Sequence, residues 1–294
     1  MRSFSRSAAA AALALSLEAG RADAEPVGPG VGPQYGTTHV YVAPADLEPF
    51  VKSFVATFGG EASKPQTTTV TPTPSQTTFV AVGTPVGRLS VFAFAGPVPY
   101  PFGPERTGYL VTDMDSAVAA ATAAGADVVV APFADPIGRD AVIQWPGGVD
   151  MQLYWHTKSS LLPPLATVPE NRVYVSPQRV DAFVDSFIRF SKGRVVSDDA
   201  QAAGVEIGRP DESYRRVRLA SDFGDLAIMA TDGHLPFPYG REMTGYAVKD
   251  LGETLKRAES AGASVLVQPF ESAGRQSAMV AFPGGYIAEI HSGE

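Results

Sequence analysis

The chain of 294 residues contains 31 acidic and 23 basic residues, which give a formal net charge of −8 at pH 7. Nucleic acids and anionic membrane surfaces bind clustered Lys and Arg, so this charge argues against both as partners. The chain has no cysteine, which excludes disulfides, thiolate nucleophiles and cysteine-bound metals.

Residues 1–24 carry the pattern of an export signal. Arg2 and Arg6 precede an apolar run over residues 8–17, and Ala22-Asp23-Ala24 offers a small-x-small cleavage site. The run is shorter than the roughly 20 apolar residues that span a bilayer. We therefore expect an exported protein, periplasmic or secreted, with no membrane association after cleavage. A disordered or membrane-tethering N-terminus is the alternative.

The rest of the chain contains the same pattern twice. The stretch from Val98 to Tyr109 returns from Leu235 to Tyr246, where 246 − 109 = 137. Pro146-Gly147-Gly148 and Pro283-Gly284-Gly285 keep that spacing, since 283 − 146 = 137. A repeat of this length is a domain, because solenoid repeats have periods of about 20–50 residues. We place linkers at residues 25–35 and 161–170 and domains at residues 36–160 and 171–294.

Both domains show the same order of elements. Alternating or apolar runs predict strands, and apolar residues at helical spacing behind an Asp predict helices. Domain 1 is predicted to have helices from Asp46 to Gly59 and from Asp113 or Asp115 to Gly125, and strands at 38–42, 77–82, 89–94, 109–111, 128–130, 141–145 and 151–155. Domain 2 is predicted to have helices ending at Gly193 and running from Asp250 to Gly262, and strands at 173–175, 246–248, 265–267, 279–282 and 287–290. Each domain thus contains two strand–helix–strand–strand–strand units, an α+β organisation.

Four such units, paired into two domains, resemble the vicinal oxygen chelate superfamily of glyoxalase I, extradiol dioxygenases and bleomycin-resistance proteins. The resemblance rests on the strand and helix cap at 109–115 and 246–251, the helix stops at 123–126 and 260–263, and the two Pro-Gly-Gly turns. It implies four βαβββ units paired into two glyoxalase-like half-barrel domains. In the family, the concave face of each half-barrel holds a metal.

The resemblance also implies where metal ligands would lie, on the first strand of each unit and on the last strand of each domain. In domain 1 these positions hold His39, Arg106 and Gln152. Arg cannot ligate a metal, so His39 and Gln152 are the candidate ligands for one divalent ion, with Glu105 and His156 as auxiliaries. The alternatives are that His39 binds or activates a substrate without a metal, or that it is structural.

In domain 2 the corresponding positions hold Arg172, Met243 and Glu289. A cation facing the remaining carboxylate should form an ion pair that fills the place of a metal. We therefore expect an Arg172–Glu289 pair and no metal in domain 2. The alternative is that Arg172 binds an anionic substrate.

Further side chains are candidates for substrate binding. Tyr109 and Tyr246 occupy equivalent positions in the two copies, and strand alternation puts Tyr154 on the face of Gln152. Arg139 follows a Gly, as Arg275 does. The two arginines are expected to line the cavity or to pair with acids.

Several other features have simpler interpretations. His291 lies close to the C-terminus and is expected to fray, and His234 is expected on a surface loop. The threonine-rich segment Thr67–Thr78 indicates a hairpin or a mobile loop. The aromatic–proline loops at 100–102 and 237–239 are either rigid connections or a hydrophobic lip on the cavity.

Three hypotheses for function follow. The first is an exported enzyme of lyase or isomerase type that acts on a small oxygenated metabolite. In it His39 is base or metal ligand, Gln152 and Glu105 assist, and Arg106 steadies a developing oxyanion. The second is a metal-free protein that binds or sequesters a small molecule. In the third, domain 2 only completes the pocket of domain 1. The incomplete ligand sets argue against an extradiol dioxygenase, and a homodimer is left open.

Overall fold

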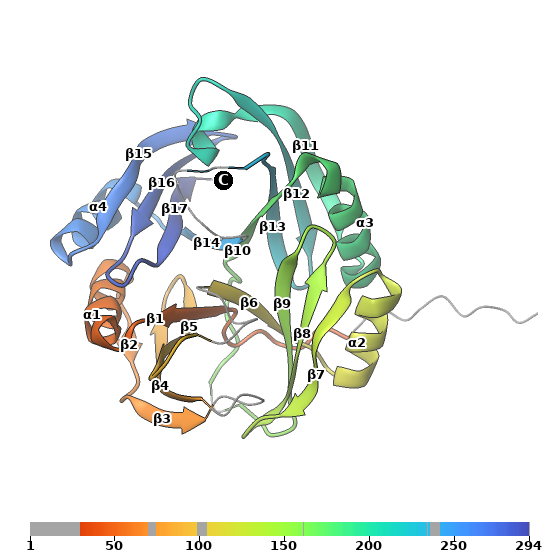
Figure 1. Ribbon diagram of the computed structural model, residues 1–294. Coiled ribbons are helices and arrows are strands. Elements are labelled where there is room, and N and C mark those ends of the chain that lie inside the picture. Colours follow the sequence, from red (N-terminus) through yellow and green to blue (C-terminus); the bar gives the residue numbers. More distant parts are fainter. Residues whose placement is uncertain are drawn as a thin grey trace, which may run out of the picture.

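The computed structural model describes residues 30–69, 75–98, 105–160, 162–233, 235 and 242–293. It contains two mixed sheets, one in each half of the chain (Figure 1). Among the described residues, no helix has the length and apolar character that a membrane span needs.

The sheet of domain 1 has the strand order β2-β4-β5-β1-β6-β9-β8-β7, with β3 paired to β4. Its helices are α1 (Leu47–Phe58) and α2 (Met114–Ala123). Its strands are β1 (Thr38–Val42), β2 (Glu61–Ala62), β3 (Gln66–Thr69), β4 (Gln76–Thr84), β5 (Gly87–Phe94), β6 (Glu105–Leu110), β7 (Asp127–Ala134), β8 (Gly138–Trp145) and β9 (Val149–His156).

The sheet of domain 2 repeats this arrangement with the order β11-β12-β13-β10-β14-β17-β16-β15. Its helices are α3 (Val180–Ser191) and α4 (Leu251–Ser260), and a short 3-10 helix, η3 (Gly204–Ile207), follows β11. Its strands are β10 (Glu170–Val175), β11 (Arg194–Ala203), β12 (Ser213–Ser221), β13 (Gly224–Ala230), β14 (Glu242–Ala247), β15 (Ser264–Ser272), β16 (Arg275–Ala281) and β17 (Ile287–Gly293).

The pairing of strands confirms the predicted units. The first strand of each unit lies parallel to its last strand, as in β1–β5 and β6–β9. The two units of a domain then meet through antiparallel first strands, β1–β6 in domain 1 and β10–β14 in domain 2. The α+β fold with two curled half-barrel sheets is therefore present, and His39 and Arg106 lie opposite each other at the centre of the first sheet.

One predicted helix cap is absent from the structure, and two others are present. Asp46 was expected to cap α1, but it ends a 3-10 turn, Pro44–Asp46, and makes no capping hydrogen bond. The expected caps Asp113 and Asp250 do accept hydrogen bonds from Ser116 N and Glu253 N, at 2.7 and 2.9 Å. The threonine-rich segment forms a hairpin in its described part, since β3 pairs antiparallel with β4.

The two largest hydrophobic cores each join the two domains. One core packs α2 and the second half of the first sheet against α3 and the first half of the second, around Trp145 and Phe187. The other packs α1 against α4 around Phe54 and Tyr246. Figure 1 shows α1 beside α4 and α2 beside α3. The convex faces of both sheets are thus buried between the domains, and the concave faces are left for function.

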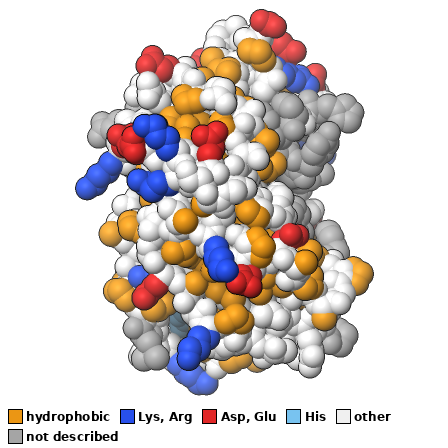
Figure 2. Space-filling view, turned by 90° about the vertical axis from the view of Figure 1, so that its left-hand side faces the viewer, with side chains coloured by type: hydrophobic (Ala, Val, Ile, Leu, Met, Phe, Trp, Pro, Cys, Tyr) orange, Lys and Arg blue, Asp and Glu red, His pale blue; other side chains and the backbone are white. Residues whose placement is uncertain are grey.

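The outer face that carries α1 and α4 has basic and acidic side chains close together (Figure 2). Lys52 pairs with Glu48 on α1, and Lys256 pairs with Glu253 on α4. Exposed pairs of this kind add little stability. They show that the basic residues of these two helices do not form a separate positive patch.

Candidate functional site

The concave face of domain 1 brings together the predicted residues His39, Arg106 and Gln152. His39 on β1 pairs with Arg106 on β6, and Gly108 on β6 pairs with Gln152 on β9. Side chains two residues apart on a strand share a face, so Tyr41 lies on the same face as His39. The absence of a side chain at Gly108 is needed there, because a Cβ would lie 2.8 Å from the His39 ring.

A chain of hydrogen bonds crosses this face. The Nε of Arg106 donates to Oε1 of Gln152 at 3.1 Å, and a second guanidinium nitrogen donates to the same oxygen. The Nε2 of Gln152 donates to Oδ2 of Asp140 on β8 at 3.1 Å. The amide of Gln152 is therefore oriented by a cation on one side and a carboxyl group on the other.

Burial shifts the pKa values of both titratable neighbours of Arg106. The pKa of His39 is lowered to about 3 by burial and by the charge of Arg106, so the imidazole is neutral at physiological pH. Its Nδ1 lies 3.3 Å from the backbone oxygen of Arg106. The pKa of Asp140 is raised to about 7 by burial and by the charge of Asp135. Asp140, rather than His39, therefore changes charge near neutral pH.

An aromatic wall stands beside the polar chain. Phe92 on β5 stacks on His39 and on Tyr41, with ring centroids 6.1 and 5.5 Å apart, and Phe79 on β4 continues the wall at 5.3 Å. The guanidinium carbon of Arg106 lies 5.7 Å from the centroid of the Tyr41 ring. Phe79 and Phe92 are only partly buried. The face thus combines accessible aromatic surface with a cation and an amide.

One end of this face is covered by the segment that precedes β1. Residues 25–35 were predicted to be a linker, but in the described part Gly32 N donates to Leu110 O at 2.9 Å. The hydroxyl of Tyr154 donates to Gly36 O at 3.0 Å, and Tyr35 stacks on His156. Tyr154 and His156 therefore hold this segment against the sheet.

The donor set of domain 1 does not fit a divalent metal. Of the three positions implied by the family resemblance, one holds Arg106, whose guanidinium occupies the oxygen of Gln152 that would ligate. His39 is the remaining donor. Nowhere in the described part of the chain do three or more His, Asp or Glu side chains form a group that could hold a metal. The prediction of His39 and Gln152 as metal ligands is thus not supported by their geometry.

The equivalent centre of domain 2 holds a buried charge network. The predicted ion pair is present, with Arg172 Nη1 3.7 Å from Glu289 Oε1. Arg172 also lies 3.0 Å from Glu170 and 3.9 Å from Glu206. Burial alone would raise the pKa of Glu289, but the charge of Arg172 and a hydrogen bond from His291 hold that pKa well below its usual range. These carboxylates are therefore committed to a guanidinium, and the set does not fit a metal.

The concave face of domain 2 is also filled. The turn η3 places Glu206 and Ile207 in it, both buried, where Glu206 bonds to Tyr214 and Arg216. The remaining space is occupied by an apolar cluster of Tyr174, Ala202, Ile207, Tyr214, Ala227, Met229, Leu235, Met243 and Met279. Both polar centres are buried, but that of domain 1 adjoins the partly exposed rings of Phe79 and Phe92, whereas that of domain 2 is covered by a turn and an apolar cluster.

Three predicted substrate-binding residues lie elsewhere. Tyr109 is 1% exposed in one interdomain core, and Tyr246 is 0% exposed in the other. Their neighbours Gly108 and Gly245 face the concave sides, so strand alternation turns both tyrosines away. Arg139 pairs with Asp115 of α2 at 3.0 Å, on the convex side. Tyr109 and Tyr246 therefore do not line a concave face, and Arg139 takes the second of its two expected roles, pairing with an acid.

Arg139 and Arg275 are not equivalent residues. Arg139 pairs with Trp155 on β9, and its neighbour Gly138 pairs with His156. His156 occupies the position of Gly293 in the repeat, and Gly293 on β17 is the partner of Arg275. The strand register therefore makes Gly138 the counterpart of Arg275. Arg275 is buried and donates to Glu170 at 2.8 Å.

Of the remaining predictions, one is corrected by the structure, and the others concern residues or side chains that the structure does not describe. His291 was expected to fray, but it is buried, and its Nδ1 lies 2.6 Å from Glu289 Oε2. Both aromatic–proline loops and His234 lie outside the described residues. Glu105 begins β6 opposite Val40, and its side chain is outside the description.

Residues that the sequence prediction missed complete both centres. Asp140 sits opposite Tyr154 on β8 and β9, and this register could not be read from the sequence. Glu170 could have been found, since it lies two residues before Arg172 on the same strand face. Glu206 could not, because it comes from a turn between strands.

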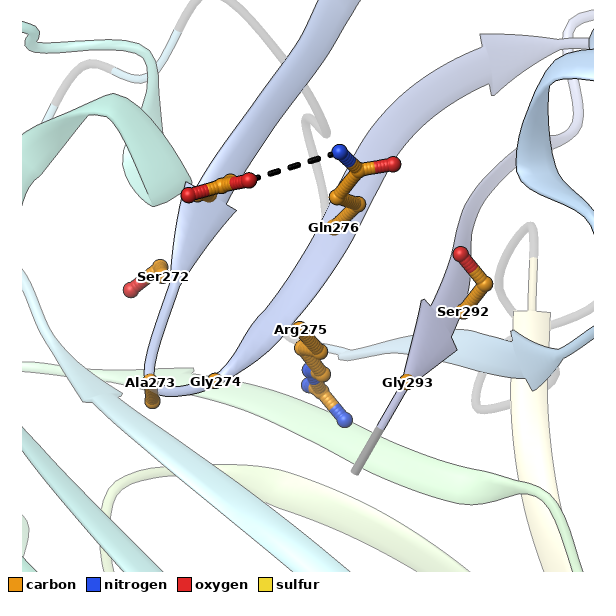
Figure 3. Close-up of a pocket in the computed structure, with 8 residues that line it drawn as sticks. Ser272, Ala273, Gly274, Arg275, Gln276, Ser292 and Gly293 are labelled. Atoms are coloured by element: carbon orange, nitrogen blue, oxygen red, sulfur yellow. Dashed lines mark hydrogen bonds between the residues drawn. The ribbon is translucent and has the colours of Figure 1, made fainter.

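Two shallow hollows lie outside the centre of domain 1, and the first adjoins the charge network of domain 2 through Arg275. One, of about 520 Å³, is formed by residues 271–276, 292 and 293 at the turn between β15 and β16. Figure 3 shows Arg275 projecting to the opposite side of β16 from Gln276, which bonds to Glu271. The other, of about 580 Å³, lies between the domains near Trp145 and Arg179.

The fold can now be compared with solved structures. A Mn(II)-bound glyoxalase from Novosphingobium aromaticivorans is similar over 90% of this chain and 83% of its own, with 15% identity and a TM-score of 0.54. The chain has the vicinal oxygen chelate fold. A mutant 4-hydroxymandelate synthase from Streptomyces coelicolor is similar over 90% and 93%, with 12% identity and a TM-score of 0.59.

A third similar structure of this fold is 2,2',3-trihydroxybiphenyl 1,2-dioxygenase from Sphingomonas wittichii, over 90% of this chain and 91% of its own, with 16% identity and a TM-score of 0.55. No protein-family model matches the sequence, and no curated protein matches it either. At these identities the likeness concerns the fold, which supports many reactions. Function must be argued from the two concave faces.

Proposed function

We propose that this protein binds a small aromatic molecule on the concave face of domain 1 without a metal. The observation that carries the proposal is the guanidinium of Arg106, which bonds to Gln152 at the centre where the family resemblance implies a metal. A ligand with a planar ring and an oxygen acceptor matches this face. Its ring would stack on Phe92 and Phe79, and its oxygen would accept from Arg106.

The neutral state of His39 favours binding over general base catalysis by that residue. A base acts best when its pKa lies near the working pH, and the pKa of His39 is lowered to about 3. A neutral imidazole stacked on Phe92 still offers a flat, weakly polar surface. His39 therefore belongs to the wall of the proposed binding face.

One observation favours a second candidate, an acid–base enzyme of lyase or isomerase type. Asp140 is partly buried, accepts a hydrogen bond from Gln152, and has a pKa raised to about 7. A carboxyl group with this pKa can hold a proton or release it near neutral pH. In this candidate Asp140 moves a proton and Arg106 stabilises negative charge on the substrate oxygen.

The sequence of residues 1–24 also leads us to propose where the protein acts. Their pattern supports an exported protein that meets its ligand outside the cytosol, and domain 2 would act as a scaffold. Mass spectrometry of the protein recovered from expressing bacteria tests the export. A mature chain beginning at Glu25 in the periplasm or medium supports it, and an uncleaved chain in the cytosol contradicts it.

The binding proposal is tested with purified protein and a panel of aromatic carboxylates and phenols, measured by calorimetry with and without EDTA. Arg106→Met removes the guanidinium and introduces the residue that domain 2 carries at its equivalent position, Met243. Arg139→Gln is the matched control, since Arg139 pairs with Asp115 on the convex side. We expect binding that survives EDTA, is lost in Arg106→Met and is kept in Arg139→Gln. Binding that requires a metal contradicts the proposal.

A further inference from the structure

One of the four arginines on the concave face of domain 2 has no carboxylate paired with it. The guanidinium groups there belong to Arg172, Arg216, Arg218 and Arg275. The carboxylates beside them are Glu206 and Glu289, which are buried, and Glu170 and Asp199, which are partly buried. A charge away from water is costly unless a partner neutralises it. An arginine without a paired carboxylate therefore needs an explanation.

The arginine without a paired carboxylate is Arg218. Glu206 bonds to Arg216, and Glu170 and Glu289 contact Arg172 and Arg275. Arg218 is only partly exposed, yet its side chain makes no hydrogen bond or ion pair with any residue that the structure describes, and its Nε is buried.

Acids at the rim do not neutralise Arg218. Asp199 is 3.6 Å from Arg216, and its side chain is 44% exposed. Asp225 is exposed, and no ion pair joins it to Arg218 in the described part of the chain. The nearby carboxylates are thus either bound to other arginines or directed to solvent.

Strand register brings Arg218 close to a second arginine. Arg218 on β12 pairs with Ala227, which in turn pairs with Arg172 on β10. Arg275 reaches this region from β16 through its bonds to Glu170, which lies two residues before Arg172. Figure 3 shows Arg275 pointing away from Gln276. Burial, and then the charge of Arg275, lower the pKa of Arg218.

The duplication shows that the fold does not require these two arginines. The counterpart of Arg218 in domain 1 is Ala81, since Arg218 pairs with Ala227 and Ala81 pairs with Ser90. The counterpart of Arg275 is Gly138, since Arg275 pairs with Gly293 and Gly138 pairs with His156. Domain 1 thus builds the same strands with Ala81 and Gly138. The two guanidinium groups are additions specific to domain 2.

We propose that Arg218 and Arg275 form a binding site for a small oxyanion, the carboxylate or phosphate group of a ligand, at the mouth of domain 2. A planar guanidinium binds carboxylate or phosphate oxygens through two parallel hydrogen bonds. Arg218 supplies such a fork, and Arg275 supplies a second positive charge. The site is separate from the binding face of domain 1, so either proposal can fail without the other.

The test is thermal unfolding of the full chain with sodium phosphate or sodium acetate, against sodium chloride at matched ionic strength. Arg218→Gln is compared with Arg215→Gln, which lies on the opposite face and removes surface pairs with Asp181 and Asp198. We expect phosphate or acetate at ten times its dissociation constant to raise the Tm of wild type and Arg215→Gln by about 3 °C. Arg218→Gln should lose this shift.

A second readout separates binding from a structural role. Without added oxyanion, Arg218→Gln should unfold at the same temperature as wild type or higher, because it relieves repulsion from Arg275. A lower Tm for Arg218→Gln without oxyanion, or an equal oxyanion-induced shift in wild type and Arg218→Gln, overturns the proposal. So does the absence of a shift in wild type.

Discussion

The two concave faces have the same strand arrangement and differ in the partners of their central arginine. In domain 1, Arg106 donates to the neutral amide of Gln152 beside an aromatic wall. In domain 2, Arg172 lies among Glu170, Glu206 and Glu289 and is covered by the turn η3. The comparison shows how one half-barrel can keep its polar centre beside a partly exposed aromatic wall, while its duplicate uses the same centre as internal structure.

Replacement of the two central arginines should give the largest difference between the domains. Arg172→Met leaves three buried carboxylates without their shared cation, and we expect a loss of about 3–5 kcal/mol in the free energy of unfolding. Arg106→Met removes hydrogen bonds to one neutral amide and should cost only about 1 kcal/mol. Urea unfolding of both variants measures the difference. Equal losses of unfolding free energy in the two variants would contradict the expected difference between the domains.

The junction between the domains contains a buried acid that should make stability depend on pH. Glu242 accepts hydrogen bonds from Thr107 N and Oγ1, at 3.2 and 2.9 Å. Burial raises the pKa of Glu242 from 4.5 to about 8. The folded protein therefore holds this proton more tightly than the unfolded chain, and stability from this group falls as the pH rises between those values.

Glu242→Gln should remove that dependence. Each pKa unit corresponds to about 1.4 kcal/mol, so the variant should gain stability on the order of a few kcal/mol by pH 8, and little at pH 4. Unfolding midpoints measured from pH 4 to pH 9 test this expectation. A variant less stable than wild type at pH 8 would show that the carboxylate is ionised and well solvated.

Asp140→Asn should have a smaller effect, confined to domain 1. The pKa of Asp140 is raised to about 7, so its contribution to stability is present below pH 3.8 and is lost as the pH rises to about 7. The variant should therefore be more stable than wild type at pH 8 by about 1–2 kcal/mol, after allowance for partial solvation. Ligand binding in wild type should titrate near pH 7 and become flat in Asp140→Asn. An unchanged pH profile of binding in Asp140→Asn would show that Asp140 does not take part in binding.

The smallest effect is expected at His39. Because its pKa is lowered to about 3, His39 does not change charge between pH 5 and pH 8. His39→Gln should alter affinity by less than tenfold, through lost stacking on Phe92, and should leave the pH profile as in wild type. Calorimetric titration at both pH values measures this. A profile that loses a midpoint near pH 6 would mean that His39 titrates in the native protein.

The fold was predictable because its signals are local and occur twice. Strand alternation, the helix caps at Asp113 and Asp250, and the Pro-Gly-Gly turns each depend on neighbouring residues, and the duplication repeats them. The arginine at the centre of domain 2 was also predictable, since its position follows from the repeat. The packing of α1 on α4 was not, because nothing local shows which convex faces meet.

The candidate site was predictable only in part. His39, Arg106 and Gln152 do lie together, because each occupies the first or last strand of a unit. Tyr109 and Arg139 were misplaced, since a shift of one residue along a strand moves a side chain to the other face. Asp140 and Glu206 were missed because cross-strand register and the path of a turn are set by tertiary packing.

Titration with Mn(II), followed by electron paramagnetic resonance of the free ion, tests the central claim most directly. In both domains a guanidinium occupies the centre where a metal would bind, so wild type should leave millimolar Mn(II) essentially free at pH 7. Stoichiometric Mn(II) binding that is lost in His39→Ala, or in Glu289→Gln, would contradict this account.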